Sequence, residues 1–133
     1  MIFKGGKLFY RDRFQSLDMR VEGNRIVEIG EALHGDRARD MTGKKLLPGL
    51  VDVHSHGCVG YDFSNASVEE MRRMCLHYAG RGVTAVLATT MTNPVDTIRT
   101  AMSNVHELME EQKERRQGAR VLGVNMEGPF LGA

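Results

Sequence analysis

Two histidines at the end of an apolar segment are the residues in this sequence best suited to do chemistry. The run Leu46–Val53 leads into His54 and His56, which are separated by a single serine. Successive side chains of a β-strand point to opposite faces, so residues two positions apart lie on the same face. Two imidazoles that project together from a strand end form half of a metal site, and imidazole suits zinc, iron and nickel. The spacing therefore predicts that His54 and His56 bind a metal ion.

A carboxylate follows a second apolar segment further along the chain. Val121–Met126 reads as a strand, and Glu127 comes directly after it. The carboxyl ends of parallel strands open onto one rim, where barrel enzymes form their active sites. Two strand spacings amount to roughly 10 Å, which a long carboxylate can bridge. We therefore expect Glu127 to be a third metal ligand, and Asp52 to support the ligands or the fold from deeper in the sheet.

The alternation of side chains predicts which residues of these two strands face the interior and which face a helix layer. The predicted interior residues are Leu50, Asp52, His54 and His56 in the first strand, and Gly123, Asn125 and Glu127 in the second. The predicted helix-facing residues are Val51, Val53, Leu122, Val124 and Met126. The polar side chains therefore gather on the interior face.

The segment between these two strands reads as helix, strand, helix. Ser67–Glu70 has the pattern of a capping box. An apolar stripe follows at helical spacing, made of Val68, Met71, Met74, Cys75 and Tyr78. Val83–Thr90 then reads as a strand. A second helix should begin with Asn93 as its cap and Pro94 in its first position, and Gly118 should close it.

The first part of the chain has a different pattern. A Gly-Asn pair lies between two alternating apolar segments within Val21–Ile29, which is typical of a β-hairpin. An apolar segment within residues 3–9 indicates an earlier strand, and residues 30–43 read as a loop or a weak strand. We therefore predict part of a small β domain over residues 1–45 and a (β/α) domain over residues 46–133.

Strands that alternate with helices favour right-handed crossovers and a parallel sheet, either open and doubly wound or part of a (β/α) barrel. A complete eight-stranded barrel needs about 250 residues, and residues 46–133 are too few for one. We therefore expect an α/β fold in which these residues form three strands of a parallel sheet, either open or part of a barrel. The sequence then reads as the front portion of a larger protein.

Composition restricts the class of function. The chain has 133 residues, with 18 basic and 17 acidic side chains and a formal net charge of +1. Such an even balance offers no electrostatic surface for nucleic acid or for an anionic membrane. No apolar stretch approaches the roughly 20 residues of a transmembrane helix, and the start lacks the layout of a signal peptide. We therefore expect a cytoplasmic protein that acts on a small molecule.

The remaining cysteines and histidines carry weaker signals. Cys58 and Cys75 should be free thiols, because nothing in the sequence indicates secretion. Cys58 follows His56 closely enough to be weighed as a soft ligand, but the glycines around it favour a small loop residue. His77 and His106 lie on the predicted helices, away from any strand end, which favours surface or structural roles.

Two segments resemble a known family. Pro48–Gly57 resembles the first-strand signature of the amidohydrolase superfamily. More narrowly, Gly82–Thr90, a helix and then Leu122–Phe130 resemble the N-acetylglucosamine-6-phosphate deacetylase family in order and spacing, and Glu-Gly-Pro-Phe at 127–130 is the deciding element. The resemblance implies a metal-bearing (β/α)8 barrel with a small β-sandwich domain. It also implies a hydrolase that removes the acetyl group from N-acetylglucosamine-6-phosphate in amino-sugar catabolism.

The resemblance also implies roles for the three predicted ligands. In that family the glutamate at the end of the third strand holds a metal, a role that falls to Glu127 here. Some members lack the histidine pair and work with one metal, so His54 and His56 allow a second ion. The implied cofactor is one or two divalent ions, zinc or iron. The family's other metal histidines and its catalytic aspartate would lie beyond Ala133, so this stretch should be inactive alone.

The substrate's phosphate needs cationic partners that the nearby sequence does not supply. No Lys or Arg occurs in residues 54–71, 88–98 or 124–133. The resemblance therefore implies that other sequence or a neighbouring subunit binds the sugar phosphate, and that the full-length form is a homo-oligomer, namely a dimer. Two alternatives stand beside this hypothesis: another amidohydrolase, such as a deaminase or cyclic amidase, and a non-catalytic module completed by a partner chain.

Overall fold

The structure is a computed structural model that describes residues 1–115 and 117–128. The chain divides into two compact units, one ending at Pro48 and the other beginning at Gly49. Within the described residues, neither helix combines the length and the apolar character needed to cross a lipid bilayer. Pro129 and Phe130, which belong to the family-like motif, lie outside the described residues.

The first unit consists of two small sheets. One has the strand order β5-β4-β1-β6 and the other β3-β2-β7. The strands are β1 (Ile2–Lys4), β2 (Lys7–Tyr10), β3 (Arg13–Gln15), β4 (Asp18–Glu22), β5 (Arg25–Gly30), β6 (Ala38–Asp40) and β7 (Lys45–Leu46). The predicted hairpin is confirmed, since β4 and β5 pair antiparallel and Gly23 adopts a φ of +57° in the turn between them. The apolar segment in residues 3–9 is divided between β1 and β2.

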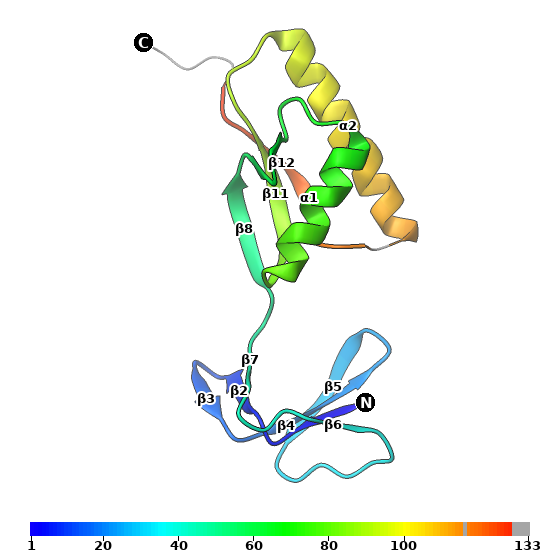
Figure 1. Ribbon diagram of the computed structural model, residues 1–133. Coiled ribbons are helices and arrows are strands. Elements are labelled where there is room, and N and C mark those ends of the chain that lie inside the picture. Colours follow the sequence, from blue (N-terminus) through cyan, green and yellow to red (C-terminus); the bar gives the residue numbers. More distant parts are fainter. Residues whose placement is uncertain (116, 129–133) are drawn as a thin grey trace. The chain divides into compact units, whose positions relative to one another are not determined.

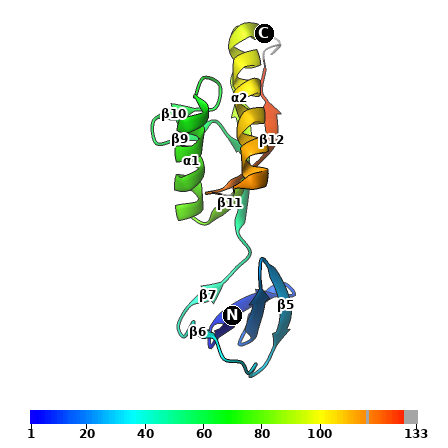
Figure 2. The same cartoon turned by 90° about the vertical axis from the view of Figure 1, so that its right-hand side faces the viewer.

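The second unit has a parallel sheet of three strands in the order β12-β11-β8. Its elements are β8 (Leu50–Ser55), β9 (Gly57–Cys58), β10 (Tyr61–Asp62), α1 (Val68–Gly80), β11 (Val83–Thr90), α2 (Val95–Glu114) and β12 (Arg120–Met126). Both helices lie on the same face of this sheet (Figures 1 and 2). The predicted alternation of strand and helix is confirmed, and the second strand spans the predicted residues.

Helix α1 forms as its sequence predicts. The Ser67 hydroxyl accepts a hydrogen bond from the Glu70 amide, and the Glu70 carboxylate accepts one from the Ser67 amide. This capping box satisfies amide groups that have no partner inside the helix. The buried face of the helix consists of Met71, Met74, Cys75 and Tyr78. These side chains pack against Val86 and Ala88 of β11 in one core cluster.

The predictions for the ends of α2 are wrong. Pro94 is the N-cap rather than the first helical residue, and the Asn93 amide donates to the Met91 carbonyl oxygen instead of capping the helix. The helix ends at Glu114, four residues before Gly118. Gly118 has a different role: a Cβ there would lie 2.5 Å from the Cys75 carbonyl carbon, so glycine allows the chain to pass close to α1.

Two of the predicted helix-facing sets need correction. Val51 and Val53 are 55% and 59% exposed and lie outside the core cluster under the helices. In the pairing of β8 with β11, it is Asp52 that lies opposite the buried Val86. Leu122 is 45% exposed because it is the extra residue of a β-bulge. The bulge turns Val121 toward the helices instead, where it is buried. Val124 packs against the core as predicted, whereas Met126 does not and is 48% exposed.

Candidate metal centre

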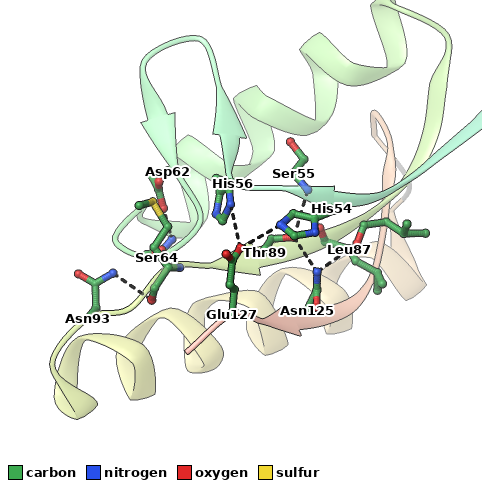
Figure 3. Close-up of polar contacts among 12 residues, drawn as sticks. His54, Ser55, His56, Asp62, Ser64, Leu87, Thr89, Asn93, Asn125 and Glu127 are labelled. Carbon is green, nitrogen blue, oxygen red and sulfur yellow. Dashed lines mark hydrogen bonds and ion pairs between the residues drawn. The ribbon is translucent and has the colours of Figure 1, made fainter. Parts of the chain in front are cut away.

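The side chains of His54, His56 and Glu127 converge on the face of the sheet opposite the helices. His54 and His56 come from the end of β8, and Glu127 follows β12, with β11 between the two strands. One carboxylate oxygen, Oε2 of Glu127, lies 2.9 Å from His54 Nε2 and 3.2 Å from His56 Nε2 (Figure 3). The predicted convergence of these three residues is therefore present, and it spans a neighbouring strand.

The backbone holds Glu127 in this place. Its amide donates to the Thr90 carbonyl oxygen at 3.3 Å, which extends the β11–β12 ladder by one residue. The next residue, Gly128, has a φ of +90°. A Cβ at that position would lie 2.5 Å from the Thr92 hydroxyl oxygen. Only a residue without a Cβ therefore fits this backbone conformation and this close contact with Thr92.

The arrangement fits a divalent cation in its donor types and its spacing. Each of the three residues offers one ligand atom, and all three atoms lie within 4.8 Å of one another. Zinc ligands lie about 2.0–2.2 Å from the ion in a tetrahedron, so any two of them are separated by about 3.4 Å. The distances from Glu127 Oε2 to the two histidine Nε2 atoms, 2.9 Å and 3.2 Å, are close to this ligand–ligand separation. Two imidazoles and a carboxylate also suit iron and manganese, so the donor set does not select one metal.

His56 carries a second ring nitrogen with an unusual environment. Its Nδ1 is buried and has no hydrogen-bond partner within residues 1–115 and 117–128. A ring nitrogen of a metal-bound histidine normally donates to a carboxylate, a carbonyl or a water. The side chains of all three residues remain partly exposed, at 56% for His54, 37% for His56 and 43% for Glu127. The described residues therefore supply one side of a site and leave the other side open.

Asp52 supports the backbone of the histidine pair. Its Oδ1 accepts a hydrogen bond from the His54 amide at 3.1 Å. The sequence predicted a supporting role for this residue, and the contact identifies the group that it holds. Asp52 is not among the three residues whose ligand atoms converge.

Ser55, between the two histidines, points to the helix layer and was missed as a functional residue. Its hydroxyl lies 2.5 Å from the Tyr78 hydroxyl of α1. Burial raises the pKa of Tyr78 to about 12, so the phenol stays protonated at neutral pH and can donate to the serine. The sequence signal was present, because alternation puts residue 55 on the face opposite residues 54 and 56.

The other cysteines and histidines take no part in the convergence. Cys58 packs against the core and donates to the Met74 carbonyl oxygen, and burial raises its pKa, which favours the neutral thiol over a thiolate ligand. Both Cys58 and Cys75 are free thiols, as predicted. His77 and His106 lie on α1 and α2, on the helix side of the sheet.

A small pocket adjoins the three residues. It has a volume of about 160 Å³ and is lined by His56, Met91, Thr92 and Glu127. A larger depression of about 570 Å³ lies over the two helices, and there the Arg72 guanidinium pairs with Glu111 at 2.7 Å. The small pocket is the one next to groups that can bind a cation, so it is the candidate substrate pocket.

Comparison with known sequences finds several N-acetylglucosamine-6-phosphate deacetylases and a dihydroorotase similar to this chain. No protein-family model matches the chain. The N-acetylglucosamine-6-phosphate deacetylase of Vibrio furnissii is 34% identical over 88% of this chain, and that of Bacillus subtilis is 37% identical over 65%. The dihydroorotase of Lactobacillus acidophilus is 33% identical over 97% of the chain. The chain spans between 22% and 29% of the length of these three relatives.

Solved structures agree with the sequence relatives. The crystal structure of N-acetylglucosamine-6-phosphate deacetylase from Pasteurella multocida matches 98% of this chain and 35% of its own, with a TM-score of 0.86 at 24% identity. The corresponding enzyme from Thermotoga maritima matches 99% of this chain and 33% of its own, with a TM-score of 0.80 at 26% identity. Over nearly its whole length, this chain therefore resembles part of the N-acetylglucosamine-6-phosphate deacetylases of the amidohydrolase superfamily.

Proposed function

We propose that the protein carrying this chain is a metal-dependent hydrolase that removes the acetyl group from N-acetylglucosamine-6-phosphate. In this proposal, Gly49 onward forms the first three βα units of a (β/α)8 barrel, and residues 1–48 form part of its small β domain. The protein acts in the cytoplasm as a homodimer. The deacetylase of Vibrio furnissii is similar to this chain over 88% of the chain's length, which supports the proposed reaction. The parallel strand order β12-β11-β8 supports the proposed barrel.

The single observation that carries the proposal is the position of the Glu127 carboxylate. It lies within 3.2 Å of both histidine Nε2 atoms although Glu127 follows His56 by 71 positions in the sequence. Two imidazoles and a carboxylate whose ligand atoms all lie within 4.8 Å of one another have the donor types and the spacing to share one bound partner. A divalent cation, zinc or iron, held by His54, His56 and Glu127 is that partner.

Each residue then has a defined task. His54 and His56 would hold the ion through ring nitrogens and Glu127 through its carboxylate, so none of the three would be free to carry the proton of the attacking water. When bound, a divalent ion would supply a water of lowered pKa and a Lewis acid for the acetyl carbonyl. The proton transfer to the amine leaving group needs a further carboxylate. We propose that this carboxylate, the remaining ligands and the phosphate-binding cations come from outside these 133 residues.

Metal binding and hydrolysis can be tested separately. The natural protein that carries this sequence, stripped of metal, should bind Zn²⁺ in a calorimetric titration, and Glu127→Gln should weaken binding about 10-fold or more because one of the three described ligands loses its charge. Glu107→Gln is the matched control, since Glu107 is an exposed glutamate of α2. Equal affinities for the wild-type chain and Glu127→Gln would refute the ligand assignment.

Hydrolysis is assayed on the natural protein that carries this sequence. Purified with Zn²⁺ or Fe²⁺, it should release acetate from N-acetylglucosamine-6-phosphate, and a chelator should abolish the release. The control Glu107→Gln should keep the activity, and Glu127→Gln should lose it. Absence of acetate release by the metal-loaded wild-type protein would overturn the proposed reaction.

A second candidate function rests on one observation. The dihydroorotase of Lactobacillus acidophilus is nearly as similar to this chain as the deacetylases are. A cyclic amide and an acetamide use the same metal-assisted attack on a carbonyl, so the three described ligands do not distinguish between them. Parallel assays with dihydroorotate and with N-acetylglucosamine-6-phosphate decide between the two. We favour the deacetylase because both crystal structures and most of the relatives described above bear that name.

A further inference from the structure

The strand that carries the histidine pair is irregular where the histidines begin. In the pairing of β8 with β11, Asp52 lies opposite Val86. Ser55 lies opposite Ala88, so β8 advances three residues while β11 advances two. Such a shift disrupts the ladder locally and leaves backbone groups in need of other partners. The Ser55 amide finds one in a side chain, because it donates to the Thr89 hydroxyl at 3.1 Å.

Asn125 extends this contact across the sheet. Its Nδ2 lies 3.4 Å from the Thr89 hydroxyl and 3.4 Å from the Val53 carbonyl oxygen. Figure 3 shows Thr89 with dashed contacts to both neighbouring strands. Val53 directly precedes His54, and Asn125 lies two residues before Glu127. The threonine and the asparagine therefore connect the backbone of the histidine pair to the strand that presents the carboxylate.

The hydrogen-bonding capacity of Thr89 is fully used. A hydroxyl has one proton to donate and two lone pairs to accept with. The Thr89 hydroxyl accepts from the Ser55 backbone amide and from the Asn125 side-chain amide, and it donates to the Leu87 carbonyl oxygen at 3.5 Å. The residue is completely buried, so no water replaces a lost partner. Removing the hydroxyl would leave the Ser55 amide without this acceptor at the irregular point of the strand.

We infer that Thr89, together with Asn125, is a positioning residue that sets the aim of His54 and His56 at Glu127. The inference rests on the proposed metal centre but concerns residues that touch no metal. It follows from where the contacts lie: on the backbone between the two histidines, and on the strand that leads to the carboxylate. Partners that orient metal ligands typically change metal affinity by about 10–100-fold when they are removed.

The adjacent residue offers a matched control. Thr90 lies on the same strand and is equally buried, but its hydroxyl has no hydrogen-bond partner within the described ranges of the chain. Thr89→Val and Thr90→Val are therefore the same substitution at the same depth, and only the first removes contacts to the histidine strand. Thr89→Ser keeps the hydroxyl and should restore most of what Thr89→Val loses.

The test uses the natural protein that carries this sequence, stripped of metal, and two readouts. Zn²⁺ affinity, measured by competition with a chromogenic chelator, should fall about 10–100-fold in Thr89→Val and remain at the wild-type value in Thr90→Val. In the metal-free chain, hydrogen exchange of the Ser55 amide should accelerate at least about 10-fold in Thr89→Val only. If Thr89→Val fails to fold by circular dichroism, Asn125→Leu replaces it, with the same expected loss of Zn²⁺ affinity.

The outcomes separate this inference from the proposed function. Wild-type affinity in Thr89→Val, or an equal loss in Thr90→Val, overturns the inference and leaves the metal centre standing. A wild-type chain that binds no Zn²⁺ overturns the metal centre and the inference with it. Loss of affinity in Thr89→Val, recovery in Thr89→Ser and no change in Thr90→Val support a positioning role.

Discussion

Replacing Gly128 by alanine should displace Glu127, because the backbone after the carboxylate has a conformation and a contact that only glycine tolerates. Gly128 has a φ of +90°, and a Cβ there would lie 2.5 Å from the Thr92 hydroxyl oxygen and 3.1 Å from the Thr92 Cα. The hydroxyl can rotate away, but the Cα belongs to the backbone. The substitution therefore requires movement of the chain next to Glu127.

The expected cost has two parts. A left-handed conformation costs an L-residue about 1–2 kcal/mol, partly offset by about 0.4–1 kcal/mol because alanine restricts the unfolded chain. Overpacking against Thr92 adds about 1–3 kcal/mol. The first part can be measured alone with Gly82→Ala, since Gly82 has a φ of +85° and a Cβ there would meet no atom within 4 Å. Gly128→Ala should therefore destabilise the chain more than Gly82→Ala does.

The assay combines urea unfolding with Zn²⁺ titration of the natural protein that carries this sequence. Gly82→Ala should lower the free energy of unfolding and leave Zn²⁺ affinity unchanged. Gly128→Ala should lower both, because the shift is next to a ligand. Adding Thr92→Ala removes the hydroxyl oxygen and should recover part of the affinity. Equal stability of the two alanine variants, together with unchanged Zn²⁺ affinity in Gly128→Ala, would refute the reasoning.

Three further predictions concern stability and association. The side-chain amide of the buried Gln112 bonds two backbone groups at the start of β12, and Gln112→Met should lower the free energy of unfolding by about 1–3 kcal/mol for each of them. Asn104→Leu removes one bond to a backbone carbonyl, so urea unfolding should show a smaller loss. Burial raises the pKa of Tyr78 from 10.0 to about 12, so the neutral phenol favours the folded state below pH 10. This contribution to the free energy of unfolding, roughly 2–3 kcal/mol, is lost as pH rises from 10 toward 12. Tyr78→Phe should reduce that loss in unfolding curves measured between these two pH values. The described sheet has unpaired outer edges on β8 and β12, so the isolated chain should self-associate or melt at low temperature. A monomer in sedimentation, together with a cooperative melt at high temperature in calorimetry, would contradict this.

The sequence predicted the elements of the second unit well because their signals are local. The capping box at Ser67 and the stripe of buried residues in α1 depend only on residues within one helix. Val83–Thr90 is a continuous apolar run between glycines and a turn, so its bounds were clear. The pair His54 and His56 could be assigned to one face because alternation in a strand is also local.

Predictions that depended on neighbouring strands were less accurate. Leu122 was assigned to the helix face by simple alternation, but the bulge in the pairing of β11 with β12 reverses the alternation before Gly123. The bulge arises from the match between two strands, and its sign within β12 is Gly123, a strand glycine with a φ of +155°. The exposure of Val51 and Val53 likewise depends on the register of β8 against β11, which the sequence of β8 alone does not encode.

By itself, the sequence determined that two imidazoles share a face at a strand end and that a carboxylate ends a later strand. Only the tertiary structure decided that they meet, with Oε2 of Glu127 2.9 Å and 3.2 Å from the two Nε2 atoms. It also decided that Thr89 and Asn125 hold the intervening backbone. The physical reason is that residue type and periodicity act over a few residues, whereas ligand distances depend on the register between strands that are far apart in the chain.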